Sequence, residues 1–87
     1  MTVKPTGRID TTTAPAFAKL LENLAGETEL VIDLAEVNYM SSAGLRCLLL
    51  AHTAMAKQGG AMKLVNVQKT VRDVLGFTGF DQLFAIS

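Results

Sequence analysis

Thiol, imidazole and indole groups are scarce in this 87-residue chain, which has one cysteine, one histidine and no tryptophan. A single cysteine cannot form a disulfide within the chain. Cys47 and His52 also fall short of the ligand sets that zinc usually takes. We therefore expect no metal and no other cofactor, and we predict that Cys47 is a small buried hydrophobic residue. The lack of a disulfide framework favours a cytoplasmic location.

Net charge and long apolar runs are missing as well. Eight basic and eight acidic residues give a formal net charge of zero, whereas binding to a phosphate backbone needs clustered lysine and arginine. The longest apolar run, residues 47–51, is far shorter than the about 20 residues that span a bilayer. Residues 1–9 lack the apolar stretch of a signal peptide. The sequence thus predicts neither nucleic-acid binding nor membrane insertion.

Apolar residues nevertheless make up 49% of the chain, and they recur with the periods of strands and helices. Strands are predicted at residues 2–9, 30–34 and 62–66. The nearly continuous apolar run at 30–34 is expected to be covered on both faces. Residues 80–86 fit either a last short strand or a packed segment.

Three helices are predicted between these strands, at residues 14–25, 43–58 and 67–78. Thr13 is the expected N-cap of the first helix, and Gly26 is its expected stop. Strands that alternate with helices indicate a sheet with parallel members and right-handed crossovers. The fold class predicted is therefore α/β, in a single domain over residues 1–87.

Ser42, His52, Asp10 and Asp33 are the residues from which a hydrolase would build a catalytic triad. Ser42 and His52 lie ten positions apart on one predicted helix, which separates them by about 15 Å along its axis. They cannot share a hydrogen bond, so we predict no enzyme activity and place His52 in the core. Asp33 is expected to order a loop by accepting hydrogen bonds from N–H groups near Ser41.

The turn Ser-Ser-Ala-Gly-Leu at residues 41–45 precedes the longest predicted helix. A serine at a helix start can cap the helix through its oxygen. An exposed serine can also accept a phosphate, which changes the local charge by about −1.5 to −2. Ser42 is therefore predicted as a cap and as a candidate for modification. Ala43 and Gly44 are expected to leave the turn open to a partner.

Residues 31–34 (Val-Ile-Asp-Leu) and 39–46 (Tyr-Met-Ser-Ser-Ala-Gly-Leu-Arg), followed by an apolar helix, resemble the STAS domain of bacterial anti-sigma factor antagonists. Residues 7–14, 64–67 and 74–80 extend the resemblance over nearly the whole chain. It implies a small STAS-like domain with a mixed sheet of three or four strands and helices packed against it. The family's N-terminal strand and C-terminal helix look shortened or absent, which would expose a sheet edge through which two copies could form a homodimer.

The resemblance also implies a function in transcription regulation by partner switching. Members of this family bind an anti-sigma factor that is also a serine kinase, are released when it phosphorylates them, and are restored by a serine phosphatase. Aligned on Gly44 and Leu45, the phosphoacceptor falls on Ser42. Ser41, where the family often has aspartate, is the alternative acceptor. The implied partner-binding residues are Asp10, Ser41, Ser42, Ala43, Gly44 and Arg46. The alternative function is a non-phosphorylated STAS scaffold subunit of a lipid-transport or stress-signalling complex.

Overall fold

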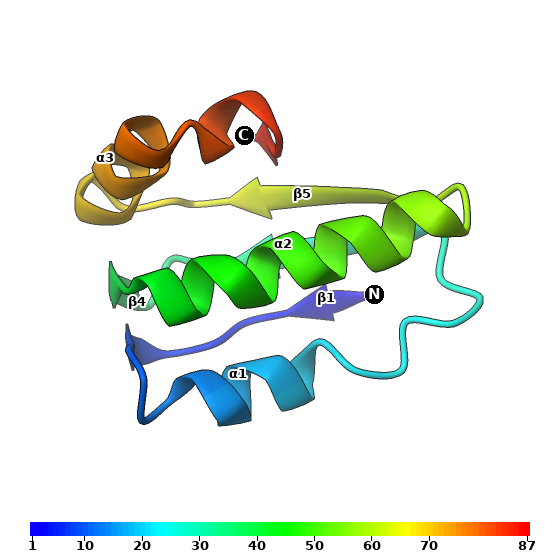
Figure 1. Ribbon diagram of the computed structural model, residues 1–87, viewed down its shortest axis with the longest axis horizontal. Helices are drawn as coiled ribbons and strands as arrows, with labels where there is room; N and C mark the ends of the chain where they lie inside the picture. The colour runs from blue at the N-terminus through cyan, green and yellow to red at the C-terminus, as the bar shows by residue number, and fades with distance from the viewer.

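The structure, a computed structural model, describes residues 1–87. Its strands are β1 (Thr2–Val3), β2 (Gly7–Ile9), β3 (Glu29–Asp33), β4 (Val37–Met40), β5 (Ala61–Val65) and β6 (Ala85–Ile86). Its helices are α1 (Ala14–Leu20), α2 (Ser42–Lys57), α3 (Lys69–Thr78) and the 3-10 helix η1 (Phe80–Gln82). Figure 1 shows α1 and α2 side by side in front of the strands, with α3 and the C-terminus beyond β5.

The strands form two sheets in which every recorded pair is parallel. One sheet has the order β1-β3-β5-β6, and β2 pairs with β4 in the other. A helix lies between the two members of each pair along the chain, and crossovers of this kind produce parallel neighbours. The predicted α/β fold is confirmed. The prediction of a mixed sheet is wrong, because no hairpin joins two paired strands.

Pro5 divides the predicted strand at residues 2–9 into β1 and β2, which belong to different sheets. Proline has no N–H to donate to a strand ladder, so the chain can change sheets there. β4 was not predicted. Val37 and Met40 are buried at its ends with two exposed residues between them, so it lacks the alternation by which a strand is recognised.

The four-stranded sheet buries one face. In β3, Leu30 and Ile32 are fully buried, whereas Glu29 is exposed and Val31 is partly exposed. The same alternation recurs in β5. The prediction that residues 30–34 are covered on both faces is therefore wrong: Val31 makes the run look continuous, but it lies on the more open face.

Helix lengths follow the predictions most closely in the second half of the chain. α2 matches its predicted range to within one residue, and α3 ends before Gly79, which has the left-handed φ of 80° that suits a glycine. The first helix is shorter than predicted, since α1 ends at Leu20 and not near Gly26. The chain after it is not helical, and Asn23 there adopts a positive φ of 60°. Residues 80–86 form η1 and β6, so a last short strand is present.

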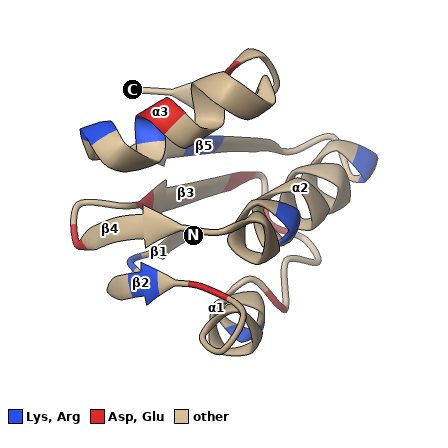
Figure 2. Ribbon diagram, turned by 60° about the vertical axis from the view of Figure 1, so that its left-hand side comes forward, with Lys and Arg blue, Asp and Glu red and all other residues tan.

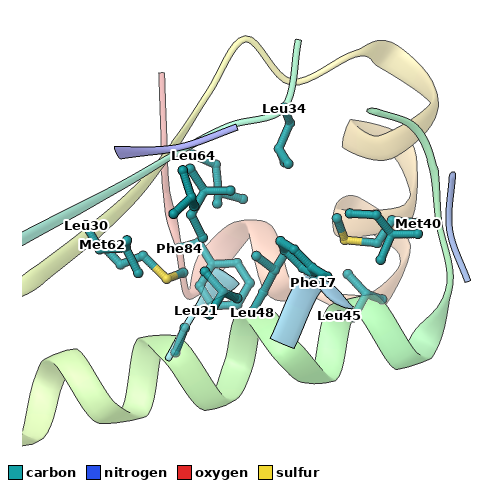
Figure 3. Packing of buried hydrophobic residues seen from close by; sticks show 14 of the residues in the cluster. Phe17, Leu21, Leu30, Leu34, Met40, Leu45, Leu48, Met62, Leu64 and Phe84 are labelled. Atoms are coloured by element: carbon teal, nitrogen blue, oxygen red, sulfur yellow. The ribbon is translucent and has the colours of Figure 1, made fainter. Parts of the chain in front are cut away.

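A single cluster of 19 buried hydrophobic residues lies between the strands and the helices. Figure 3 shows Leu30 and Leu64 of the strands, with Phe84 near them, above Leu48 of α2. Burying a leucine or phenylalanine side chain stabilises a fold by about 1.5–3 kcal/mol. This packing fixes α2, and with it the serine turn at its N-terminus, against the sheets.

Candidate partner-binding site at the start of α2

The carboxyl ends of β2 and β4 lie side by side, since Ile9 is the register partner of Met40. The N–H of Ser41 donates a hydrogen bond of 2.8 Å to the carbonyl of Ile9. Asp10 and Ser41 are therefore neighbours just beyond this edge, and α2 begins at Ser42. The structure thus brings together Asp10 and the serine turn, two predicted site elements that lie far apart in the sequence.

The two serines of the turn differ in exposure. Ser41 occupies the N-cap position of α2 in an extended conformation, but its side chain makes no capping bond. Its Oγ is buried and has no hydrogen-bond partner. Ser42 is the first residue of the helix and is exposed. The prediction that Ser42 caps the helix is therefore wrong by one residue, and Ser42 is the more accessible of the two.

Gly44 is buried, and its missing side chain serves internal packing. A Cβ built on it would lie 2.7 Å from Cγ2 of Ile9 and 2.7 Å from Cγ of Met40. We expected the small Gly44 to leave the turn open to a partner. Its missing side chain instead makes room for Ile9 and Met40 inside the protein. Ala43 is partly exposed, and Arg46, one turn beyond Ser42, is exposed and takes part in none of the ion pairs.

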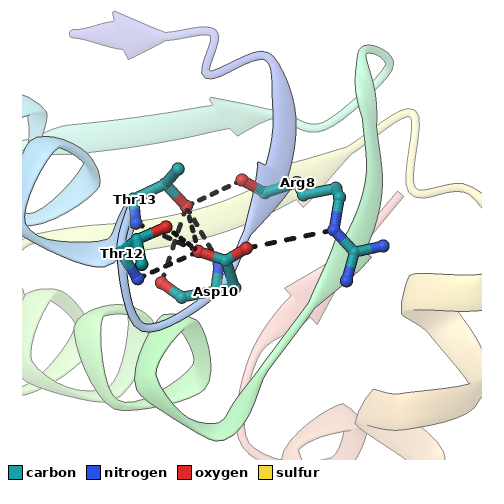
Figure 4. A network of polar contacts seen from close by, with 4 residues as sticks. All are labelled: Arg8, Asp10, Thr12 and Thr13. Atoms are coloured by element: carbon teal, nitrogen blue, oxygen red, sulfur yellow. Dashed lines mark hydrogen bonds and ion pairs between the residues drawn. The ribbon is translucent and has the colours of Figure 1, made fainter.

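The carboxylate of Asp10 orders the turn between β2 and α1 (Figure 4). Its Oδ1 accepts hydrogen bonds from the Thr12 hydroxyl at 2.7 Å, the Thr12 N–H at 2.9 Å and the Thr13 N–H at 3.1 Å. The Thr12 hydroxyl and then these backbone N–H groups hold the pKa of Asp10 below its usual value. Asp10 therefore places a negative charge beside the serine turn at neutral pH.

Thr13 stands at the N-cap position of α1, as predicted, but its side chain makes no capping bond. Its hydroxyl instead donates to the carbonyl of Arg8 at 2.7 Å and accepts from the N–H of Asp10 at 2.9 Å. These contacts tie the turn to β2, so Asp10 and Thr13 order it together.

Arg8 and Tyr39 form a contact next to this turn that sequence reasoning missed. They are register partners on β2 and β4, and the Arg8 guanidinium carbon lies 4.2 Å from the centroid of the Tyr39 ring. Arg8 Nε also lies 3.9 Å from Oδ2 of Asp10. The pairing depends on β4, which was not predicted. A tyrosine within the short segment Val-Asn-Tyr-Met was the one weak signal for that strand.

Asp33 orders a different loop, as its carboxylate accepts hydrogen bonds from the Ala35 N–H at 3.0 Å and the Asn66 side-chain amide at 3.2 Å. These contacts, that of Ala35 first, lower its pKa. The loop-ordering role is confirmed, but the prediction that the donors lie near Ser41 is wrong, because β3 ends in the other sheet.

His52 and Cys47 lie further along α2. His52 was predicted in the core, but it is only half-buried and packs edge-on against Phe84 at the border of the core, with ring centroids 5.4 Å apart. Cys47 is also half-buried rather than fully buried, with Sγ 3.7 Å from the carbonyl of Ala14, and burial raises the pKa of its thiol. Both residues contribute to packing between α2 and its neighbours.

The structure offers neither a cluster of metal ligands nor a membrane-spanning helix. No three histidine, cysteine, aspartate or glutamate side chains are grouped so that they could hold a metal ion. None of the helices combines the length and the apolar character needed to cross a membrane.

Comparisons with known proteins point to one family. The sequence model of the STAS domain family matches residues 1–87. The chain is 34% identical over 82 residues to the anti-sigma-B factor antagonist of Bacillus subtilis, an alignment that covers 93% of this chain and 75% of that protein. It is 36% identical over 62 residues to BtrV of Bordetella bronchiseptica, which covers 71% of this chain but only about half, 53%, of BtrV.

A solved structure adds support for the fold. The anti-sigma factor antagonist from Mycobacterium paratuberculosis superposes with a TM-score of 0.84 and 30% sequence identity. The match covers 98% of this chain and 74% of that one.

Proposed function

Because this chain belongs to the STAS domain family, we propose that it is an anti-sigma factor antagonist controlled by phosphorylation of Ser42. The unmodified protein binds an anti-sigma factor that is also a serine kinase. Transfer of the γ-phosphoryl group of ATP to the Ser42 hydroxyl, with release of ADP and a proton, ends the binding. A serine phosphatase restores it. The observation that carries this proposal is the exposure of Ser42 at the first position of α2.

The names of two similar proteins support the choice of partner. The Bacillus subtilis and Mycobacterium paratuberculosis proteins are both named anti-sigma factor antagonists, at 34% and 30% identity. In this proposal the chain acts in the cytoplasm as a binding protein and not as an enzyme. The partner contacts Asp10, Ser41, Ser42, Ala43 and Arg46, while the buried Gly44 holds α2 in place behind them.

Local electrostatics explain how one phosphate could end binding without unfolding the domain. The first N–H groups of α2 form the positive end of the helix dipole, which stabilises a nearby negative charge by about 0.3–1 kcal/mol. A phosphate on Ser42 would therefore be tolerated within the fold. It would also add to the negative charge that Asp10 carries on the same edge of the molecule, so that a partner must bury two negative groups instead of one.

Phosphoryl transfer can be tested directly with the cognate anti-sigma factor kinase, ATP and mass spectrometry. Label is expected on Ser42 in the wild type and in Ser41→Ala, and it should be lost in Ser42→Ala. Label confined to Ser41 would move the acceptor by one residue. Label on neither serine would contradict the switch and favour the non-phosphorylated scaffold subunit.

Partner release can be tested with Ser42→Asp, which should lose binding to the kinase while its unfolding transition stays cooperative. Gln82→Asp is a matched control, because it adds the same charge at an exposed position of η1. Binding of Ser42→Asp with wild-type affinity would refute the charge argument.

Pairing of two copies through a sheet edge stays a prediction. The edges of the four-stranded sheet are β1 and β6, and each has two residues. Strands this short offer few backbone groups to a second chain. Sedimentation equilibrium would detect such a dimer.

A further inference from the structure

A groove of about 140 Å³ opens between α1 and α2, and every residue that lines it is hydrophobic. Leu21 and Leu24 form part of one wall. The α2 wall follows the spacing i, i+3, i+4 and i+7 and consists of Cys47, Leu50, Ala51 and Ala54. Leu50 stands at the rim with 59% of its surface exposed. The wall is thus one continuous apolar face of α2 that α1 does not fill.

Helix lengths and side-chain sizes explain why the groove is open. α1 has seven residues and α2 has sixteen, so at about 1.5 Å per residue the second half of α2 extends beyond α1. Figure 1 shows the chain leaving α1 as a loop below this part of α2. Ala51 and Ala54 are too small to fill the space.

The charges of α2 are all of one sign, although the whole chain is neutral. The helix contains Arg46 and Lys57 and no acidic residue, and neither cation takes part in an ion pair. Figure 2 shows them as two blue bands on an otherwise uncharged helix. They stand eleven positions apart, about 16 Å along the axis, with Leu50 between them. On the α1 side of the groove, Lys19 and Glu22 carry opposite charges, so that side has no excess of one sign.

The groove is continuous with the proposed switch surface. Ser42, Arg46 and Leu50 follow one another at intervals of four residues, and all three are exposed. Residues four apart are neighbours on a helix surface, so they form one stripe down α2. A partner that covers Ser42 therefore reaches the groove by extending along the same helix.

From these observations we infer that the groove receives an amphipathic helix of the partner protein. The helix would have an apolar face of about three turns with an acidic residue at each end, to meet Arg46 and Lys57. In helix-in-groove recognition the bound helix inserts apolar anchors spaced at i, i+3, i+4 and i+7 into a hydrophobic groove, and the apolar wall of α2 offers such anchors a surface to pack against. The inference rests on the proposed function for the identity of the partner, but its chemistry can be tested separately.

A synthetic helical peptide can act as the probe. It carries two glutamates eleven positions apart, with leucines one and two turns after the first glutamate, and a scrambled peptide of equal composition is the control. Titration of the 15N-labelled chain should shift the amide signals of Cys47, Leu50 and Ala54. Equal binding of the scrambled peptide, or shifts confined to other residues, would overturn the inference.

Single substitutions test which side chains contribute to peptide binding. Leu50→Ser should weaken peptide binding by about tenfold, as expected for the loss of one apolar anchor. Phe77→Ser is the matched control, because Phe77 is 90% exposed on α3 and should have no effect. Arg46→Glu and Lys57→Glu should each weaken peptide binding. Lys63→Glu is their control, because Lys63 is exposed on β5 and its replacement should leave peptide binding unchanged. Wild-type affinity in Leu50→Ser would refute the groove as the site.

A second measurement separates this inference from the proposed function. The kinase is titrated with the wild type, Leu50→Ser and Ser42→Asp. Loss of binding in Ser42→Asp alone would retain the switch and contradict the groove. Binding of the peptide in the groove, together with no label on Ser42, would retain the groove and contradict the switch. Sedimentation with phosphatidylglycerol vesicles that depends on Leu50, in the absence of peptide binding, would assign the groove to a membrane surface instead.

Discussion

Gly44 lies so close to Ile9 that a Cβ built on the glycine would stand 2.7 Å from Cγ2 of the isoleucine. This approach holds the first turn of α2 against the end of β2. Together with the pairing of β2 and β4, it keeps the serine turn and the Asp10 turn on one edge of the molecule.

Gly44→Ala is therefore expected to lower the free energy of unfolding by about 1–3 kcal/mol, because overpacking must displace α2 or its neighbours. Chemical denaturation would measure the change as a lower midpoint at an unchanged slope. The same variant should also bind the partner more weakly, since the serine turn moves with the helix.

Gly76→Ala is the control for this substitution. Gly76 lies within α3, and the nearest atom to a Cβ there would be Oδ2 of Asp81 at 3.8 Å. Replacing an unstrained helical glycine with alanine raises stability by about 0.5–1 kcal/mol. Destabilisation of similar size at both positions would contradict the assigned contact between Gly44 and Ile9.

The elements that could be predicted from the sequence are those with many periodic residues. α2 and α3 repeat their apolar positions over several turns, so their ranges were predicted closely. β4 has four residues without alternation, and α1 ends at Leu20 although no glycine or proline follows before Gly26. Pattern reasoning therefore failed where an element is short or where tertiary packing sets its boundary.

The candidate site also contains features that the sequence predicted and features that it did not. The sequence motif located the serine turn, but which serine is buried depends on a shift of one residue at the start of α2. The contact between Arg8 and Tyr39 depends on the register of two distant strands. Pairings of this kind arise from the three-dimensional arrangement and leave no local trace in the sequence.

Ser41→Ala is predicted to change the free energy of unfolding by less than about 0.5 kcal/mol, or to raise it. Replacing an ordinary capping serine with alanine lowers the free energy of unfolding by about 1 kcal/mol. The Ser41 side chain makes no capping bond, so this loss is not expected here. A buried hydroxyl without a partner carries a desolvation cost of about 1–3 kcal/mol, which the substitution removes. Thermal unfolding would test this, and a loss of 1 kcal/mol or more would contradict it.

Arg8 and Tyr39 should be energetically coupled. At a surface site the contact is worth about 0.5–1 kcal/mol, to be measured as the coupling energy of the cycle Arg8→Ala, Tyr39→Ala and the double variant. Tyr39→Phe keeps the ring and should keep most of the coupling. A coupling energy near zero would mean that the two side chains are adjacent without attraction.

Leu48 and Leu50 allow a comparison within one helix. Leu48 is 0% exposed in the core, and Leu50 is 59% exposed at the groove. Leu48→Ala should cost about 2–5 kcal/mol, whereas Leu50→Ala should stay within about 0.5 kcal/mol. Urea denaturation of both variants would test the difference. A large loss at Leu50 would show that this side chain stabilises the fold and is not available to a partner.

Asp10 and Asp33 should make the domain sensitive to acid. Hydrogen bonds lower the pKa of each carboxyl in the folded state below its usual value, so protons bind the unfolded chain more readily. Their stabilisation is complete above the unfolded pKa and is lost as the pH falls through the folded pKa. Unfolding free energies measured from neutral pH down to about pH 2 should therefore decline below about pH 4.

Asp10→Asn and Asp33→Asn should each be less stable than the wild type at neutral pH and should decline less steeply in acid. The two carboxylates order separate turns and share no hydrogen-bond partner, so their effects should add in the double variant. An unchanged acid slope in both single variants would assign the acid sensitivity to other groups. If both variants were less stable but only Asp10→Asn also weakened partner binding, Asp10 would have a binding role that Asp33 lacks.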